Sequence, residues 1–149
     1  MAEKATAACI FCSIARGEMQ ASIVRETDSV LAMMDIQPVN PGHVLVIPKA
    51  HATYLADLDG KVGGEIFQLA MQVADGLRRS GLRCEGANLF LADGEVAGQE
   101  VFHVHLHVFP RFKGDGFGLR FGPGYGKHPK REELERIAAS IKNAIPITT

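Results

Sequence analysis

Three histidines occur at every second position of one apolar segment, which reads His103-Val104-His105-Leu106-His107. In a β-strand, side chains alternate between the two faces, so the three imidazoles would share one face. A plain solvated face normally carries Thr, Lys, Glu or Ser instead, which favours a chemical role. Neutral imidazole nitrogens bind metal ions, and near pH 7 imidazole serves as nucleophile, acid or base. Both uses stay open here, and different histidines of the row can have different ones.

A second pattern with chemical potential is the C-x-x-C pair formed by Cys9 and Cys12. Such a pair suits either metal binding or redox exchange. A redox pair is expected within a βαβ unit, and no strand precedes this one. A zinc site would need two further ligands. The odd total of three cysteines predicts no disulfide framework, and Cys84 is expected to be a small buried hydrophobe.

Hydrophobic periodicity predicts the elements that carry these residues. We expect a short helix or turn over 9–16, and strands at 22–26, 30–36, 43–47, 87–92 and 101–109. A long helix is predicted at about 60–80, capped by Asp59 and ended at Ser80-Gly81, and a last helix starts near Pro129. This order predicts an α+β fold with a largely antiparallel sheet. The glycine-rich segment 114–126 lacks the strand–loop–helix context of a dinucleotide-binding fingerprint, so we expect a loop, as a lid or dimer contact.

The composition is that of an ordinary globular domain, with 46% hydrophobic and 22% charged residues. Sixteen Lys and Arg residues balance 17 Asp and Glu residues, which gives a net charge of −1. This balance predicts no nucleic-acid partner and no membrane held by bulk charge. No apolar run has the length of a membrane helix or a secretory signal, so a cytoplasmic location is expected.

Segment 103–111, H-V-H-L-H-V-F-P-R, resembles the signature of the histidine-triad (HIT) superfamily of nucleotide hydrolases and transferases. Further segments resemble zinc-containing bacterial members: 9–12, 35–43, 46–51, 97–102 and 111–116. The resemblance implies a five-stranded, largely antiparallel sheet with two main helices, assembled as a homodimer. It also implies a single domain over 1–149, with its core at 9–116 and a C-terminal glycine-rich loop and helix at 117–149.

The resemblance also implies catalytic roles. Family members cleave a nucleoside phosphate at the α-phosphorus through a nucleotidyl-histidine intermediate, and the middle triad histidine, here His105, is the nucleophile. A neutral imidazole is a good nucleophile near pH 7, and the phosphoramidate it forms is labile. His107 would hydrogen-bond a phosphate oxygen or the leaving group, and His43 would support the site.

The same resemblance implies how the nucleotide is bound. The carboxylate of Asp35 would bind the ribose, an apolar slot would hold the base, and a loop would bind the phosphates. The slot residues are Ile10, Phe11 and Ile36, and the loop residues are Gly98 and Gln99. One position departs from the family pattern, because Ala92 stands where an Asn or Gln commonly points at the phosphates. This change puts the phosphate contacts and the leaving-group preference in question.

In zinc-containing members the C-x-x-C pair is joined by two histidines, which here are His51 and His103. The resemblance thus implies a structural Zn²⁺ held by Cys9, Cys12, His51 and His103. The expected substrate is a purine nucleotide, either a dinucleoside polyphosphate or a nucleoside phosphoramidate or adenylate. The alternative function is a zinc-stabilised nucleotide-binding protein with little turnover, but binding alone does not require His105.

Overall fold

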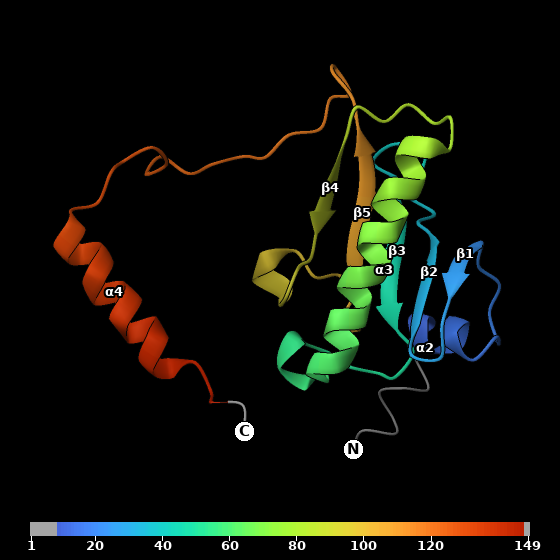
Figure 1. Ribbon diagram of the computed structural model, residues 1–149, viewed down its shortest axis with the longest axis horizontal. Coiled ribbons are helices and arrows are strands. Elements are labelled where there is room, and N and C mark those ends of the chain that lie inside the picture. The colour runs from blue at the N-terminus through green and yellow to red at the C-terminus, as the bar shows by residue number, and fades with distance from the viewer. Residues whose placement is uncertain (1–8, 148–149) are drawn as a thin grey trace. The chain divides into compact units, whose positions relative to one another are not determined.

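The computed structural model describes residues 9–147 (Figure 1). The chain forms two compact units, Met1–Phe117 and Gly118–Thr149. All strands and the helices α2 (Ile10–Ala15) and α3 (Gly60–Arg79) belong to the first unit, whereas helix α4 (Arg131–Ala144) belongs to the second. The unit boundary lies next to the end of the predicted 9–116 core. Within residues 9–147, no helix is both long and apolar enough to cross a membrane.

Five strands form one sheet in the order β1-β2-β3-β5-β4, and all neighbouring strands are antiparallel. The strands are β1 (Ile23–Glu26), β2 (Val30–Met34), β3 (Val44–Pro48), β4 (Gly86–Phe90) and β5 (Leu106–Arg111). This architecture confirms the predicted α+β class. Because β5 lies between β3 and β4, His107 sits inside the sheet, opposite Leu45 on one side and Phe90 on the other.

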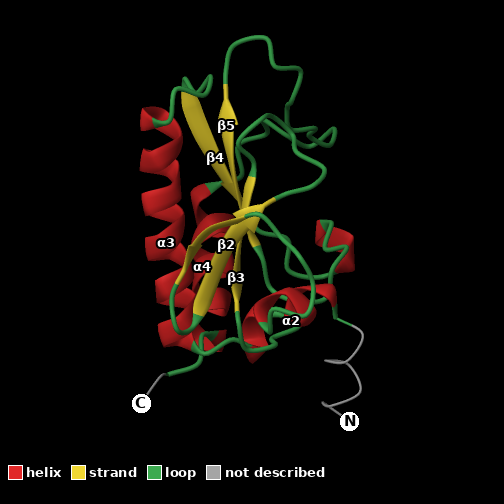
Figure 2. Ribbon diagram, turned by 90° about the vertical axis from the view of Figure 1, so that its right-hand side faces the viewer, coloured by secondary structure: helices red, strands yellow, loops and turns green. Residues whose placement is uncertain are grey.

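Helix α3 covers one face of the sheet, as Figure 2 shows. The carboxylate of Asp59 caps it as predicted, accepting hydrogen bonds from the backbone N–H groups of Lys61 and Val62. Its apolar stripe packs on the strand residues that point to this face. The buried helix residues are Ile66, Leu69, Ala70, Val73 and Leu77, and the strand residues are Val30, Ala32, Val44, Val46, Leu106 and Val108.

The short helix α2 lies against the opposite face (Figure 2). Phe11 of α2 packs in a second apolar cluster with the alternate residues of β2 and β3, namely Leu31, Met33, Leu45 and Ile47. Strands β2 and β3 are therefore buried on both faces, which explains the unbroken apolar run of β3. On β5, Leu106 and Val108 point to α3, so His107 points to the α2 face.

The predicted strand at 101–109 is corrected by the structure, because β5 begins only at Leu106. His103 and His105 precede it. The backbone N–H of Val104 donates to the carbonyl of Ala52, and the carbonyl of His103 is bonded by the ring of His105. Neither group is free for a strand ladder, which accounts for the late start. The sequence also missed two 3₁₀ turns, Leu55–Asp57 and Glu95–Ala97.

Candidate active site and metal centre

Four side chains that are far apart in the sequence meet beside α2: Cys9, Cys12, His51 and His103. The Sγ of Cys9 is 3.4 Å and that of Cys12 3.5 Å from the Nδ1 of His103. The Nδ1 of His51 is 3.2 Å from the Sγ of Cys12 and 3.2 Å from the Nδ1 of His103. Tetrahedral zinc, with bonds of about 2.3 Å to sulfur and about 2.0 Å to nitrogen, requires S–N separations of about 3.5 Å and N–N separations of about 3.3 Å. The donors therefore fit such an ion.

The hydrogen bonds of the two histidines also suit metal ligands. The Nε2–H of His103 donates to the carbonyl of Pro48 at 2.8 Å, and the Nε2 of His51 lies 3.3 Å from the hydroxyl of Thr53. With the protons on Nε2, both Nδ1 lone pairs face the two sulfurs. A ligating histidine normally donates its other ring N–H to an oxygen in this way.

The acid–base properties of the cluster favour a cation within it. Burial, together with the hydrogen bond and charge of Cys9, raises the pKa of the Cys12 thiol to about 11. Burial also lowers the pKa of His103 to about 4, which keeps its imidazole neutral and able to coordinate. Two adjacent thiolates need a compensating positive charge, and thiolate with imidazole is a donor set typical of zinc.

The cysteine pair fixes helix α2 and thereby the surroundings of His105. The Sγ of Cys9 accepts the backbone N–H of Cys12 at the start of the helix. Phe11, between the two cysteines, packs edge-on against His103 and His105, with ring centroids 5.7 and 5.2 Å apart. The metal cluster and the central triad histidine thus share one neighbour.

His105 has the geometry of a nitrogen nucleophile. It is buried, and its Nδ1–H donates to the carbonyl of His103 at 2.7 Å. This bond places the proton on Nδ1 and leaves the lone pair on Nε2. The ring is held between Phe11 and His107, whose centroid is 5.0 Å away. Its two neighbours and the carbonyl restrict its rotation.

A chain of hydrogen bonds also fixes the protons of His43 and His107. The backbone N–H of Val39 donates to the Nδ1 of His43 at 3.0 Å, so His43 carries its proton on Nε2. That Nε2–H donates to the Nδ1 of His107 at 2.9 Å. His107 therefore bears its own proton on Nε2, where it is available to a bound phosphate or leaving group.

Asp35 lies next to this histidine pair, with Oδ2 at 3.4 Å from the Nε2 of His43 and 3.8 Å from the Nδ1 of His107. Burial lowers the pKa of both histidines, against the opposing charge of Asp35, and the pKa of His107 falls to about 4. Both rings are then neutral near pH 7. These three residues could form a metal site by distance alone. However, a metal on the Nε2 of His43 would force the ring proton onto Nδ1, against the N–H of Val39.

The residues predicted to bind the base and the ribose differ in their exposure. The carboxylate of Asp35 has Oδ1 bonded by the backbone N–H of Gln37. Ile36, the next residue, is 92% exposed, and Ile10 is 42% exposed. An isoleucine this exposed beside a polar site is suited to covering an apolar base. Phe11 is buried instead, where it contacts the triad.

In the predicted phosphate loop, Gly98 and Gln99 differ. Gly98 is exposed and adopts the left-handed conformation that favours glycine, with φ at 95°. Gln99 is buried, and its amide accepts from the N–H of Gly94 and donates to the carbonyls of Thr53 and Val101. This amide is engaged inside the protein, which corrects the expectation that it meets phosphates. The backbone N–H groups of Ala97, Gly98 and Gln99 are also engaged, because they donate to the carbonyls of Gly94 and Glu95 within the same turn.

The neighbours of Ala92 do not replace the amide that the family pattern would put there. Ala92 itself is buried. Asp93 accepts the backbone N–H of Leu55 at 2.9 Å, and Asn88 accepts from a guanidinium nitrogen of Arg111 at 2.7 Å. Both side chains thus have structural partners.

Sequence reasoning missed the groups that set the ring protons: the carbonyls of Pro48 and His103 and the N–H of Val39. Every residue type carries a backbone carbonyl, so the sequence does not show which backbone groups bond to a histidine ring. The only available indication is that Pro48 and Val39 lie in the segments resembling the HIT family.

Comparisons with known proteins agree with this geometry. The HIT domain family model matches residues 16–114. A HIT family protein from Bacillus anthracis has a similar structure, with a TM-score of 0.85, 37% identity and coverage of 93% of this chain and 98% of that one. A Zn-bound histidine triad family protein from Mycobacterium smegmatis has a TM-score of 0.73, 35% identity and coverage of 94% and 99%.

Among curated proteins, an adenosine 5′-monophosphoramidase from Schizosaccharomyces pombe is 34% identical over 92% of this chain and 98% of its own. The family model covers well over half of the chain, and it includes all three triad histidines. The fold, the row of histidines and these matches agree, and the chain belongs to the HIT family.

Proposed function

We propose that this protein is a nucleotide hydrolase that cleaves at the α-phosphate through a nucleotidyl-His105 intermediate. The observation that carries the proposal is the hydrogen bond from the Nδ1–H of His105 to the carbonyl of His103, at 2.7 Å. It leaves the Nε2 lone pair for attack, beside a neutral His107 that carries a proton on Nε2.

In the first step, the Nε2 of His105 forms a bond to the α-phosphorus, and the bond between phosphorus and the leaving atom breaks. The electron pair goes to the leaving atom, which takes a proton from the Nε2 of His107 after that ring has taken up a proton from solvent, so that His107 returns to its neutral form. The nucleotidylated His105 then carries a positive charge, beside a neutral His107 whose ring centroid is 5.0 Å away. In the second step, water breaks the N–P bond and releases the nucleoside monophosphate, His105 becomes neutral again, and one proton of the water returns to solvent.

We propose a nucleoside 5′-phosphoramidate, or a related adenylate with a poor leaving group, as the substrate class. An amine leaves phosphorus only with a proton, and the Nε2 of His107 is placed to deliver one. The similarity to an adenosine 5′-monophosphoramidase supports this choice over a dinucleoside polyphosphate. Asp35 would accept hydrogen bonds from the ribose hydroxyls, Ile10 and Ile36 would contact the base, and the loop at Gly98 would contact the phosphate.

We also propose that Cys9, Cys12, His51 and His103 hold zinc, as their spacing and the similarity to a Zn-bound family member support. Bound there, zinc would supply a structural cross-link and the positive charge that keeps the two thiols ionised. The residues of the chain do the rest: Cys9 and Cys12 hold α2, and His103 offers its carbonyl to His105.

The test uses adenosine 5′-phosphoramidate with the wild type, His105→Ala and His105→Asn. Acid quenching of the wild type should trap a mass increase of one nucleoside monophosphate on the peptide that contains His105. Both variants should lose about three orders of magnitude or more in kcat. Nucleotide affinity should stay within about tenfold, because the lost interaction belongs to the reaction.

The surface variant Arg79→Ala is the control, because it breaks an exposed ion pair with Asp75 on α3 and should keep full turnover. Near-normal turnover by either His105 variant would refute the mechanism. A wild type that binds the nucleotide without turnover would favour the alternative of a nucleotide-binding protein.

A further inference from the structure

The loop that carries Asp35 and His43 is tied to the far end of β5 by Asn40. This side chain is buried, and its amide donates both hydrogens, to the carbonyl of Pro110 at 2.9 Å and to the Oδ2 of Asp115 at 2.9 Å. The backbone carbonyl of Asn40 accepts a hydrogen bond from the backbone N–H of His43 at 3.1 Å. One residue therefore connects the position of His43 to the strand that carries His107.

Asp115 is the centre to which Asn40 is attached. Its side chain is only 3% exposed. The guanidinium of Arg111 binds it with two bonds, Nε to Oδ2 at 2.5 Å and Nη2 to Oδ1 at 2.9 Å. The backbone N–H groups of Phe112 and Phe117 complete its set of donors, at 3.4 and 3.2 Å. A carboxylate with five protein donors has no role left as a base or a ligand.

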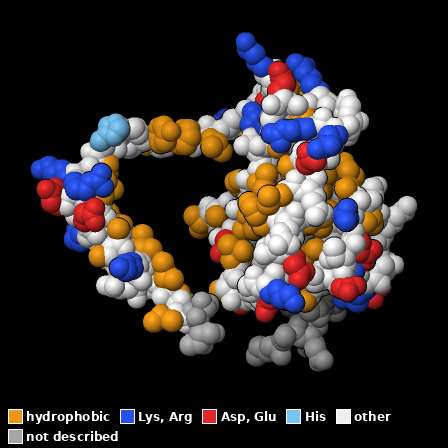
Figure 3. Space-filling view, viewed as in Figure 1, with side chains coloured by type: hydrophobic (Ala, Val, Ile, Leu, Met, Phe, Trp, Pro, Cys, Tyr) orange, Lys and Arg blue, Asp and Glu red, His pale blue; other side chains and the backbone are white. Residues whose placement is uncertain are grey.

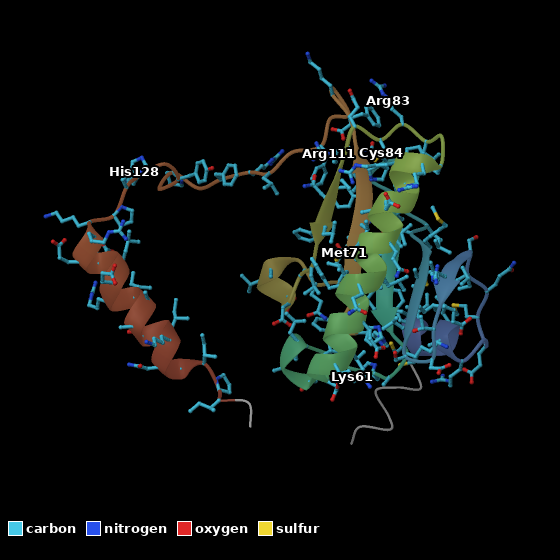
Figure 4. The ribbon with its side chains drawn as sticks, viewed as in Figure 1. Lys61, Met71, Arg83, Cys84, Arg111 and His128 are labelled. Atoms are coloured by element: carbon cyan, nitrogen blue, oxygen red, sulfur yellow. The ribbon has the colours of Figure 1, made fainter. Side chains whose placement is uncertain are left out.

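Arg111 extends the connection from Asp115 to neighbouring segments. Figure 4 labels it at the C-terminal end of β5. Besides Asp115, it donates to the Oδ1 of Asn88 on β4 at 2.7 Å and to the carbonyl of Phe117 at 2.8 Å. Its guanidinium also lies over the ring of Phe117, 4.7 Å from the centroid. The turn at 112–117 is thereby held against the sheet.

A row of aromatic rings leads from this turn back to His43. Phe117 packs edge-on against Phe109 at 5.2 Å between centroids, and Phe109 lies 4.9 Å from His43. His43 in turn lies 5.1 Å from His107. Two separate routes, one of hydrogen bonds through Asn40 and one of rings through Phe109, thus converge on His43.

We propose that Asn40, Arg111 and Asp115 form a positioning cluster, which keeps His43 against His107 so that His107 presents its Nε2–H to the leaving group. The inference deepens the proposed function and rests on it. None of the three residues touches the reacting atoms; they act through His43. The ionised state of Asp115 suits this role, because the Arg111 guanidinium holds the pKa of its carboxyl well below the usual range.

Leaving-group dependence distinguishes positioning of His107 from a merely structural role. An alkylamine needs a proton in order to leave, whereas p-nitrophenolate leaves without one. A misplaced His107 should therefore slow an adenosine 5′-(N-alkyl)phosphoramidate much more than the p-nitrophenyl ester of adenosine monophosphate. General loss of structure would slow both substrates by the same factor.

The principal variant is Asn40→Ala, which removes both donors of the amide and leaves the Arg111–Asp115 pair in place. We expect kcat on the phosphoramidate to fall about tenfold and kcat on the p-nitrophenyl ester to fall about twofold or less. KM should change little for either substrate, because Asn40 makes no substrate contact. In a His107→Ala background, Asn40→Ala should add almost nothing, since it acts through His107.

Two further measurements complete the experiment. Long-range ¹⁵N–¹H NMR reads the ring proton of His107 directly, and Asn40→Ala should convert the single Nε2–H form into a mixture of tautomers. The control Arg79→Ala breaks an exposed ion pair with Asp75 on α3 and should leave both the substrate ratio and the tautomer unchanged. If Asn40→Ala fails to fold, Asp115→Asn serves as the second variant, with the same expected signature.

Equal losses on both substrates, or an unchanged His107 tautomer, would overturn the positioning role. That result is separable from failure of the proposed function. If the wild type turned over neither substrate, or if His105→Ala kept its activity, the function itself would be refuted. If turnover depends on His105 but the substrate ratio of Asn40→Ala matches the wild type, only the positioning cluster is refuted.

Discussion

Removing the imidazole of His107 should make the protein less sensitive to acid. The folded state holds the pKa of His107 at about 4, mainly by burial and further through the charges of His105 and His43, against an ordinary value of 6.5. Between pH 6.5 and about pH 4, the His107 imidazole binds a proton in the unfolded chain but stays neutral in the folded chain. The contribution of the neutral ring is therefore complete above pH 6.5 and is lost as the pH falls toward 4.

The size of the effect follows from this window. About pH 5 lies about 1.5 pH units below the pKa of His107 in the unfolded chain. At 1.36 kcal/mol per unit, protonation of the unfolded chain lowers the free energy of unfolding by about 2 kcal/mol. The side chain of His107 is 21% exposed, so solvent reduces this toward about 1 kcal/mol. For a chain of this length, 1 to 2 kcal/mol corresponds to about 3 to 6 °C in Tm.

The assay compares the melting temperatures of the wild type and His107→Asn between about pH 7 and about pH 5. The amide oxygen of asparagine can accept the Nε2–H of His43 where Nδ1 of His107 does, so the comparison isolates titration from lost contact. The wild type should lose about 3 to 6 °C more than the variant over this range. Ser80→Ala, which keeps every histidine, should follow the wild type. Parallel curves for the wild type and His107→Asn would refute the assignment of a depressed pKa.

Three further predictions concern the rest of the molecule. Purified protein should contain about one zinc per chain, and Cys12→Ala should lose it together with about 10 °C of Tm; unchanged stability in chelator would rule the metal site out. Phe11→Ala should cost about 3 to 5 kcal/mol of stability and lower kcat, whereas an unchanged kcat would show that the ring does not position His105. The HIT resemblance implies a homodimer, and in the first unit Phe67 and Met71 of α3 are 55% and 58% exposed. Figure 3 shows hydrophobic side chains on the surface of the first unit. Light scattering should give twice the 16.1 kDa of the chain, and a mass of one chain would reject the dimer.

Much of the fold could be predicted because the buried positions of helices and strands carry apolar residues at a regular spacing. The apolar run of β3 predicted a strand buried on both faces, and α2 and α3 cover those faces. The stripe of α3 predicted its bounds, and Asp59 predicted its start. The period-2 spacing of the triad correctly brought His105 and His107 together, although His105 lies before the strand.

What the sequence could not reveal depends on long-range hydrogen bonds. Asn40 and Asp115 are 75 residues apart, and neither type has a periodic signal that would pair them. The Gln99 side chain matched a phosphate-loop position, but its amide bonds to three backbone groups, of Gly94, Thr53 and Val101, which only folding brings together. The late start of β5 likewise follows from bonds to Ala52 and the His105 ring, which compete with the ladder.

His103 joins the metal centre to the nucleophile, and this limits which substitutions can separate them. Its Nδ1 faces the two cysteines, its Nε2–H is held by the carbonyl of Pro48, and its own carbonyl sets the proton of His105. A movement of the His103 ring on loss of metal is therefore passed to the backbone that orients His105. Replacing His103 would disturb both sites at once. The Sγ of Cys12, by contrast, lies within hydrogen-bond distance of His51 and His103 of the metal cluster, so a fall in kcat in Cys12→Ala would measure the part of catalysis that depends on the cross-link.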